Sequence, residues 1–271
     1  MRELAQGVHE TQGVIFGYPF PSIVPFFTVP QFLTRKFGIQ RHHVRISANV
    51  TLRLSTVDVH HDDGLVMSTL AGGTKLWVVY PPTAHNLLSL KQYYSSSVNL
   101  FESSLHTFQH GVSLLQRDGQ TVYVPPNCPH LVFTLSSCIL YGCKITPPSV
   151  FPCRIKSFLV AVASCRLSGT GRLLGFLRHF VDDLKEALMD SPSVIPVLDA
   201  WVQEADSIGS VLITDGKAVL GNLKKTWRRF LLSSRLTSCP ACGEISGDFG
   251  GHFQVSHLAF LPSKKRKRSE Q

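Results

Sequence analysis

The chain has 271 residues, of which 44% are hydrophobic and 17% are charged, and this composition excludes an intrinsically disordered protein. No apolar run approaches the roughly 20 residues that cross a bilayer, and the N-terminus lacks the apolar core of a secretory signal, so we expect no membrane partner. The net charge is +9, and seven scattered cysteines favour a reducing compartment over a disulfide scaffold.

An aromatic and proline-rich segment opens the chain within residues 1–39. Between positions 14 and 37 there are seven Phe or Tyr residues and four Pro residues. Aromatic rings bury a large apolar area, whereas prolines interrupt regular elements. We therefore predict a packed, mostly irregular cover segment, with one short helix at residues 31–36.

The next part of the chain, up to about residue 146, is predicted to be mainly β-structure. Apolar and polar residues alternate strictly over residues 44–55, which is typical of a half-buried strand or a pair of strands. Four further strands are predicted at residues 75–80, 121–124, 131–134 and 139–141. The stretch at residues 82–118 is polar and rich in serine, and we interpret it as an insertion.

Residues 150–235 change to a helical period. Apolar residues recur at intervals of three and four over residues 173–188 and again over 219–231, which predicts two amphipathic helices. A third, shorter helix is predicted to follow Pro196, because Val197, Leu198 and Trp201 share the same spacing. Strands first and helices later indicate an α+β protein and not a doubly wound sheet.

The sequence VDVHHDDGL at residues 57–65 places His60, His61, Asp62 and Asp63 in a row. Alternate side chains of a strand share a face, so a His-x-Asp pair presents an imidazole and a carboxylate together. With a third, distant histidine, two nitrogens and one oxygen form the facial ligand set of non-haem Fe(II) oxygenases. A solvated polar turn is the alternative interpretation of this segment.

Two later stretches resemble a known family. GGTKLWVVYPP at residues 72–82 and DGQTVYVPPNCPHLVF at residues 118–133 are similar to a JmjC domain, and the similarity covers about residues 40–147. The resemblance implies a double-stranded β-helix, also called a jelly roll or cupin barrel. It also implies an Fe(II) ion held by two histidines and one acid, with 2-oxoglutarate as co-substrate and a lysine that pairs with its far carboxylate.

Carried over by position, the resemblance implies that His60, Asp62 and His130 hold the iron and that Lys75 binds 2-oxoglutarate. Each of these residues occupies the place that the family pattern gives it. The His-x-Asp pair precedes the Gly-x-Lys segment, and His130 follows the Pro-Pro loop at the start of the next strand.

A second ligand pair is left open by the residues, because His61 and Asp63 also satisfy the His-x-Asp pattern. We prefer the first pair because its spacing to Lys75 resembles that of family members with a short segment here. Strand parity continued from Val50 also puts His60, and the residues two before and two after it, on one face.

The family usually places a hydroxyl or amide side chain beside the lysine, often a Thr three residues before the first histidine. Here that position is Val57, which departs from the pattern, and the nearest hydroxyl is that of Thr56. The parity argument puts Thr56 on the same face as His60, so we name it as a co-substrate contact. Ser68 and Thr69 are the alternatives.

The resemblance implies oxidative decarboxylation of 2-oxoglutarate to succinate and CO2, coupled to oxidation of a substrate C–H bond. An N-methyl-lysine would lose its methyl group as formaldehyde, whereas an ordinary side chain would keep the hydroxyl. We therefore predict a nuclear dioxygenase that acts on a protein substrate, with a histone tail as the leading candidate. The alternative is a non-catalytic scaffold that keeps the fold and binds chromatin.

A second group of metal-binding residue types lies at residues 236–262. Cys239, Cys242, His252 and His257 follow a Cys-x2-Cys-x9-His-x4-His pattern, and two thiolates with two imidazoles can form a closed tetrahedral Zn site. The gap of nine is shorter than in DNA-reading fingers, so we predict a small zinc knuckle and not a ββα finger. Two free thiols and two surface histidines are the alternative.

A basic tail occupies residues 263–271. Lys264–Arg268 are five consecutive cations and one acid follows them, so the tail carries +4 of the net charge of +9. Such a run is typical of a segment that binds a nuclear import receptor or contacts the phosphates of DNA in chromatin. A solvated tail without a partner is the alternative.

Overall fold

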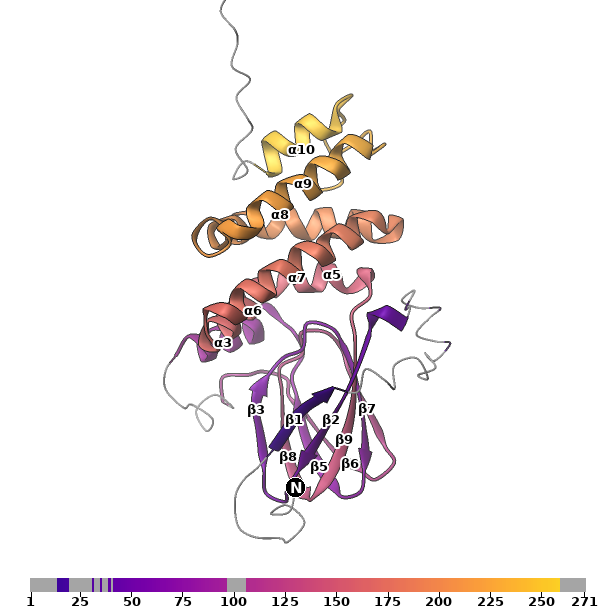
Figure 1. Cartoon of the computed structure of the whole chain (residues 1–271), viewed down its shortest axis with the longest axis vertical. Helices are drawn as coiled ribbons and strands as arrows, with labels where there is room; N and C mark the ends of the chain where they lie inside the picture. The colour runs from indigo at the N-terminus through magenta and orange to yellow at the C-terminus, as the bar shows by residue number, and fades with distance from the viewer. Residues whose placement is uncertain are drawn as a thin grey trace, which may run out of the picture. The chain divides into compact units, whose positions relative to one another are not determined.

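The structure is a computed structural model, and it describes residues 14–19, 31, 35, 39, 41–96 and 106–258 (Figure 1). The chain divides into two compact units, Met1–Leu167 and Ser168–Gln271. The basic tail and most of the predicted cover segment, including all but two residues of its short helix, lie outside the described residues. Among the helices that are described, none is long and apolar enough to cross a membrane.

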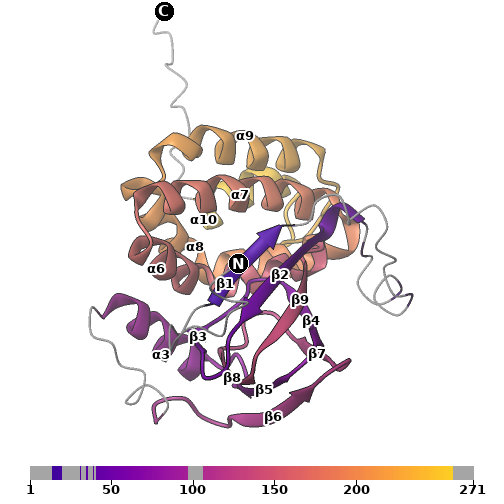
Figure 2. The same cartoon turned by 60° about the horizontal axis from the view of Figure 1, so that its bottom comes forward.

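The strands of the first unit form two antiparallel sheets (Figures 1 and 2). The first sheet has the strand order β1 (Val14–Pro19), β2 (Val44–Thr51), β9 (Cys138–Ile145), β4 (Leu65–Ala71) and β7 (Thr121–Val124). The second sheet has the order β3 (Thr56–His60), β8 (His130–Ser136), β5 (Thr74–Val79) and β6 (Val112–Arg117).

The two sheets bury a common apolar interior. Leu70, Val124 and Leu140 from the first sheet pack in one cluster with Trp77 and Val132 from the second. Burial of this apolar surface is the main term that stabilises such a two-sheet fold. The paired antiparallel sheets confirm the predicted double-stranded β-helix, and the helices that follow them confirm the α+β class.

Helices cover the outer face of the second sheet. α3 (Ala84–Ser95) contacts α6 (Phe158–Leu167), and both join a buried cluster with Val59 of β3 and Leu131 of β8. Three short elements complete the unit: η2 (Arg41–His43), η3 (Pro148–Val150) and α5 (Phe151–Lys156). Val59 and Leu131, each next to a histidine in the chain, are buried in this cluster, so the strand ends that carry His60 and His130 are held by packing.

The prediction of a polar insertion at residues 82–118 was wrong, because α3 and β6 lie within it. α3 escapes a search for apolar periodicity because one of its three buried positions is polar: they are Asn86, Leu90 and Tyr94. The start of the helix was nevertheless visible in the sequence. The hydroxyl of Thr83 accepts a hydrogen bond from the Asn86 N–H at 3.2 Å, which is an N-cap.

The mostly irregular cover segment was also wrong at residues 14–19, where β1 pairs with β2. β1 is an edge strand of its sheet, and a proline is tolerated there because one side of an edge strand forms no ladder hydrogen bonds. β4, which pairs with both β7 and β9, was also not among the predicted strands.

The second unit is helical. It contains α7 (Thr170–Met189), α8 (Ser191–Thr214), α9 (Lys217–Ser233) and α10 (Phe249–His257). α7 and α9 confirm the two amphipathic periods, and Phe180, Trp201 and Trp227 are completely or almost completely buried. The predicted third helix starts too late, because α8 runs from Ser191 through Pro196. A proline so close to the first turn removes only one backbone hydrogen bond.

Candidate metal centre

Two histidines meet at the open ends of β3 and β8. His60 is the last residue of β3 and His130 the first of β8, and the two are direct cross-strand partners. Their ring centroids are 4.1 Å apart. Directly paired residues point to the same face of a sheet, so both imidazoles reach the same end of the barrel.

The pairing of His60 with His130 depends on a β-bulge. The register shifts between Val57 and His60, so three steps along β3 match two steps along β8. A bulge of this kind re-aims the side chains that follow it. Our parity argument from Val50 was therefore wrong, because β2 ends at Thr51 and the bulge then changes the face.

Asp62 follows in the loop after β3 and completes the group. One ligand atom each of His60, Asp62 and His130 lies within 4.8 Å of the other two. The His130 Nε2 atom lies 4.0 Å from an Asp62 carboxylate oxygen. The structure thus brings together the three residues that the first His-x-Asp pair and the distal histidine supply.

Both imidazoles are oriented by backbone carbonyls. The Nδ1 atom of His60 lies 2.8 Å from the Asp58 carbonyl oxygen, and that of His130 lies 2.9 Å from the Cys128 carbonyl oxygen. A carbonyl oxygen only accepts, so each Nδ1 carries the proton and donates it. Each Nε2 then keeps its lone pair, which is the tautomer that a metal ligand requires.

The ring of His130 is also held by Trp77, which stacks on it with an interplanar angle of 27°. The Trp77 Nε1–H donates to the Gln116 side-chain oxygen at 2.9 Å. Gln116 in turn donates from Nε2 to the backbone oxygens of Ser68 and Gln120, both at 2.8 Å. This buried network fixes the wall of the site behind the histidine.

The protonation states suit a divalent cation. Burial, and next the neighbouring His60 ring, hold the pKa of His130 well below its ordinary value, so this imidazole is neutral. Burial works to raise the pKa of the Asp62 carboxyl, but the Lys144 ammonium and the two histidines outweigh it and lower that pKa. Two imidazole nitrogens and one carboxylate therefore face one another, which is the ligand chemistry of an Fe(II) centre.

In the competing pair, His61 and Asp63, the carboxylate is engaged elsewhere. One Asp63 oxygen lies 2.5 Å from the Lys144 Nζ atom and the other lies 2.8 Å from the Arg154 Nε atom. Two cations therefore occupy both carboxylate oxygens. His61 belongs to none of the metal-binding groups found among the described residues. The geometry favours His60 and Asp62 over this second pair.

Lys144 was not singled out in the sequence, although it lies beside both acids. Its Nζ atom is 3.2 Å from the Asp62 carboxylate, and it bridges the two aspartates. Burial works to lower the Lys144 pKa, but the carboxylates of Asp63 and Asp62 outweigh it and raise that pKa. The usable signal was its strand parity, because Lys144 shares a face of β9 with the buried Leu140.

Lys75 lies inside the barrel on β5 and is only 1% exposed. Its Nζ atom donates to the Thr134 hydroxyl at 3.0 Å. Within the part of the chain that the structure describes, Lys75 forms no ion pair. Burial accordingly lowers its pKa. A buried ammonium whose neighbours are the Thr134 hydroxyl and the Cys138 sulfur, with no carboxylate partner, fits a carboxylate of a co-substrate.

Thr56 is not part of this group. It is exposed on β3 and pairs with Phe133, whereas Val57, on the opposite face, pairs with the buried Val132. The hydroxyl beside Lys75 belongs instead to Thr134, and the sequence signal for it was the period of two that starts at His130. The Thr51 hydroxyl also lies in this region, 3.0 Å from the Cys138 sulfur.

Neither of the two alternative hydroxyls has a recorded contact with Lys75. Ser68 is buried on β4, and its backbone oxygen accepts from Gln116. The Thr69 hydroxyl lies 2.8 Å from the Thr121 hydroxyl of the neighbouring strand.

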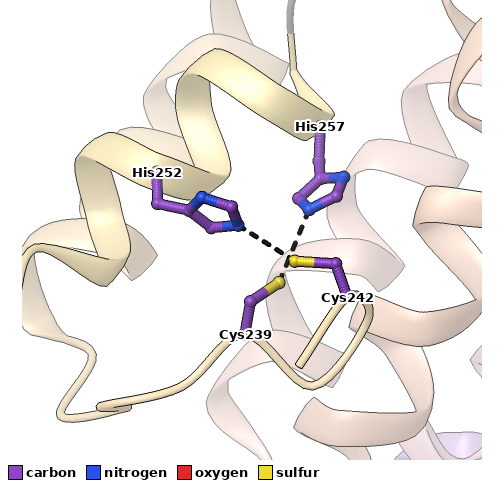
Figure 3. A group of neighbouring side chains, drawn as sticks. All are labelled: Cys239, Cys242, His252 and His257. Atoms are coloured by element: carbon purple, nitrogen blue, oxygen red, sulfur yellow. Dashed lines mark hydrogen bonds between the residues drawn. The ribbon is translucent and has the colours of Figure 1, made fainter. Parts of the chain in front are cut away.

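The residues with metal-ligand chemistry in the second unit also converge. Cys239, Cys242, His252 and His257 each place one ligand atom within 4.8 Å of the other three (Figure 3). The two sulfurs and the two imidazoles come from a short turn and from α10, respectively.

The sequence of the barrel matches the model of a known protein family. Residues 48–143 match the model of the JmjC domain, which is described as a hydroxylase. Residues 48–143 form a JmjC domain. The match spans the proposed iron ligands and Lys75. A JmjC domain is a cupin-type fold, and the family is generally dependent on Fe(II) and 2-oxoglutarate. No curated protein matches the chain.

Solved structures similar to the chain include two cupins and a protein of unknown function. A conserved protein of unknown function from Streptococcus pyogenes is 15% identical over 40% of this chain and 68% of that chain. An RmlC-like cupin from Shewanella frigidimarina is 14% identical over 38% and 67%, respectively. An RmlC-like cupin with a double-stranded β-helix from Methanocaldococcus jannaschii is 18% identical over 39% and 72%. All three have a TM-score of 0.26, and we infer nothing about activity from them.

Proposed function

We propose that this protein is a nuclear dioxygenase that uses Fe(II) and 2-oxoglutarate to oxidise a protein substrate. One observation carries the proposal: His60, Asp62 and His130 converge at one end of a JmjC barrel whose interior holds the buried Lys75 ammonium, which has no carboxylate partner among the described residues. A metal-binding cupin without 2-oxoglutarate chemistry would have no need for a buried, uncompensated lysine.

Each residue has a separate task in this proposal. His60, Asp62 and His130 hold the metal through two nitrogens and one oxygen. Lys75 and Thr134 bind the far carboxylate of 2-oxoglutarate by a charge-assisted pair and a hydrogen bond. Lys144 keeps the Asp62 carboxylate ionised and oriented. The bound metal and co-substrate supply the oxidising power, with conversion of O2 and 2-oxoglutarate to succinate and CO2 and transfer of one oxygen atom to a C–H bond.

The substrate class and the location rest on the sequence. Five consecutive cations at Lys264–Arg268 support entry into the nucleus through an import receptor, and they also support contact with DNA in chromatin. A methylated lysine of a histone tail is then the first substrate to test, and side-chain hydroxylation is the second reaction. A JmjC-fold scaffold without activity is the outcome that the assay below distinguishes.

The test is succinate formation by the purified chain with Fe(II), 2-oxoglutarate and air. We expect turnover that is lost in His60→Ala and in His130→Ala. His106→Ala is the matched control, since it removes an exposed histidine and keeps the site. Absence of succinate from the wild-type protein, with no difference between these variants, would favour the scaffold.

Histone peptides then define the reaction. Release of formaldehyde indicates demethylation, and a mass gain of one oxygen atom indicates hydroxylation. Deletion of residues 264–268 should move a fluorescent fusion out of the nucleus. An unchanged nuclear signal would contradict the import role of the tail.

A further inference from the structure

The turn between α9 and α10 presents two cysteine sulfurs to one point. Gly243 adopts a left-handed conformation with φ of +75°, and its N–H donates to the Cys239 carbonyl oxygen at 2.8 Å. The Cys239 N–H donates to the Glu244 carbonyl oxygen at 2.8 Å, and Ser238 pairs with Ile245 as an isolated β-bridge. The backbone therefore closes a tight loop around the two thiols, as zinc-binding knuckles do.

The helix that follows brings two imidazoles to the same point. The Nε2 atom of His252 lies 3.2 Å from the Cys242 sulfur, and that of His257 lies 3.5 Å from the Cys239 sulfur. Figure 3 shows all four side chains directed at a common centre. Ordinary Zn–S and Zn–N bond lengths at tetrahedral angles put sulfur and nitrogen about 3.5 Å apart. The four ligand atoms thus already have the spacing of a tetrahedral zinc site.

We propose that Cys239, Cys242, His252 and His257 bind one Zn²⁺ ion in a closed, structural site that fastens α10 to the helical unit. The second ring nitrogen of His252 supports this assignment. Its Nδ1 atom lies 3.1 Å from a Glu244 carboxylate oxygen, so Nε2 is the nitrogen left for the metal.

The fold explains why this segment needs a metal. α10 has nine residues and carries Gly250 and Gly251 in its first turn, so it is too short and too flexible to be stable alone. Its apolar contacts rest on a few side chains: Phe249 and Phe253 are buried, and the ring of Phe253 stacks on Trp227 with centroids 5.4 Å apart. Zinc would join the turn to the helix and hold Phe253 against Trp227.

The experiment measures zinc in the full chain, purified under reducing conditions and dialysed against a weak chelator. We expect about one zinc ion per chain, in line with a single four-ligand structural site. The zinc should be lost in Cys239→Ser and kept in Cys153→Ser, which changes an exposed cysteine of the first unit. It should also be kept in a His60→Ala/His130→Ala double variant, so the result is independent of the dioxygenase proposal.

Removal of the ion gives a second readout. A thiol-reactive mercurial should release the zinc and raise the solvent exposure of Trp227, seen as a change in tryptophan fluorescence. If Cys239→Ser fails to fold, replacement of zinc by Co²⁺ in the wild-type chain and in His257→Cys keeps the test decisive. The variant should retain a tetrahedral Co²⁺ spectrum with stronger thiolate charge-transfer absorption.

Three results would overturn the proposal. One is the absence of retained zinc from soluble wild-type protein. Another is the absence of a tetrahedral Co²⁺ spectrum from the His60→Ala/His130→Ala double variant, in which the other metal centre is removed. The third is a Cys239–Cys242 disulfide, found by mass spectrometry in protein that binds no metal.

Discussion

Replacement of Lys75 by methionine separates the co-substrate role of this residue from a structural one. Methionine is unbranched like lysine and only one heavy atom shorter, and it removes the charge. Lys75 is 1% exposed, and its ammonium contacts the Thr134 hydroxyl and the Cys138 sulfur, so its charge has no carboxylate partner until a co-substrate binds. Lys75→Met should therefore weaken 2-oxoglutarate binding while leaving the empty protein at least as stable as the wild type.

The magnitude follows from the interaction that is lost. A hydrogen bond to a charged group contributes about 1.5–3 kcal/mol, and about 1.4 kcal/mol is tenfold in affinity, so KM for 2-oxoglutarate should rise roughly 10- to 100-fold. The free energy of unfolding of the empty protein, by contrast, should not fall when the charge of Lys75 is removed. Burial lowers the folded-state pKa of Lys75, so the unfolded chain binds this proton more tightly. Wild-type stability therefore rises as pH increases from that lowered pKa towards the ordinary value, and the variant lacks this rise.

The assay combines succinate formation at varied 2-oxoglutarate with thermal unfolding in the presence of a non-reactive 2-oxoglutarate analogue. The analogue should raise the Tm of the wild type and of Lys156→Met, an exposed-lysine control, more than it raises the Tm of Lys75→Met. An unchanged KM in Lys75→Met would refute the assignment of this residue. A large loss of stability in the empty variant would show that the ammonium has a structural role instead.

Three further predictions concern the hydroxyl, the buried imidazole and the glycine turn. Thr134→Val removes the hydroxyl that accepts from the lysine, and KM for 2-oxoglutarate should rise about 2- to 10-fold with little effect on kcat at saturation; a fall in kcat alone would contradict this role. Burial lowers the pKa of His61 from 6.5 to about 4, so the unfolded chain binds the proton first and the metal-free protein loses stability as pH falls between these values. Chemical denaturation should show that His61→Gln flattens this dependence by about 1–3 kcal/mol, and an equally steep profile would exclude His61 as its source. Gly73→Ala should lower the free energy of unfolding by more than Gly72→Ala, measured by urea titration. Both glycines have φ of +71°, which costs an alanine about 1–2 kcal/mol. Only at Gly73 would the added Cβ also lie 2.6 Å from two backbone oxygens, and equal losses would show that the turn relaxes.

Local sequence patterns predicted a large part of the fold. Apolar and polar residues alternate along β2 because one of its faces packs on apolar neighbours such as Ile145. The alternation is a local pattern, so the strand could be predicted without knowledge of its partner. The apolar periods of α7 and α9 were equally visible, because each helix buries one stripe. α3 was missed because its buried face includes Asn86, whose amide bonds to backbone oxygens of two other loops.

The sequence by itself determined the chemical types at the site: the imidazoles, the carboxylates and a lysine in a strand. Only the tertiary structure decided which of them meet. The bulge between Val57 and His60 sets the register that pairs His60 with His130, and it turns Thr56 away. A bulge depends on how two strands pair, so the parity of one strand alone does not reveal it.

The contacts of the two lysines at the site also depend on the tertiary structure. Lys144 neutralises Asp62 and Asp63 across 82 residues of chain, and Thr134 meets Lys75 across 59. Such contacts arise from the closure of two sheets around one interior, since closure brings together side chains whose separation in sequence has no fixed value. The zinc-type cluster is the contrasting case, because Cys239 and His257 are only 18 residues apart and their spacing in the sequence already pointed to their meeting.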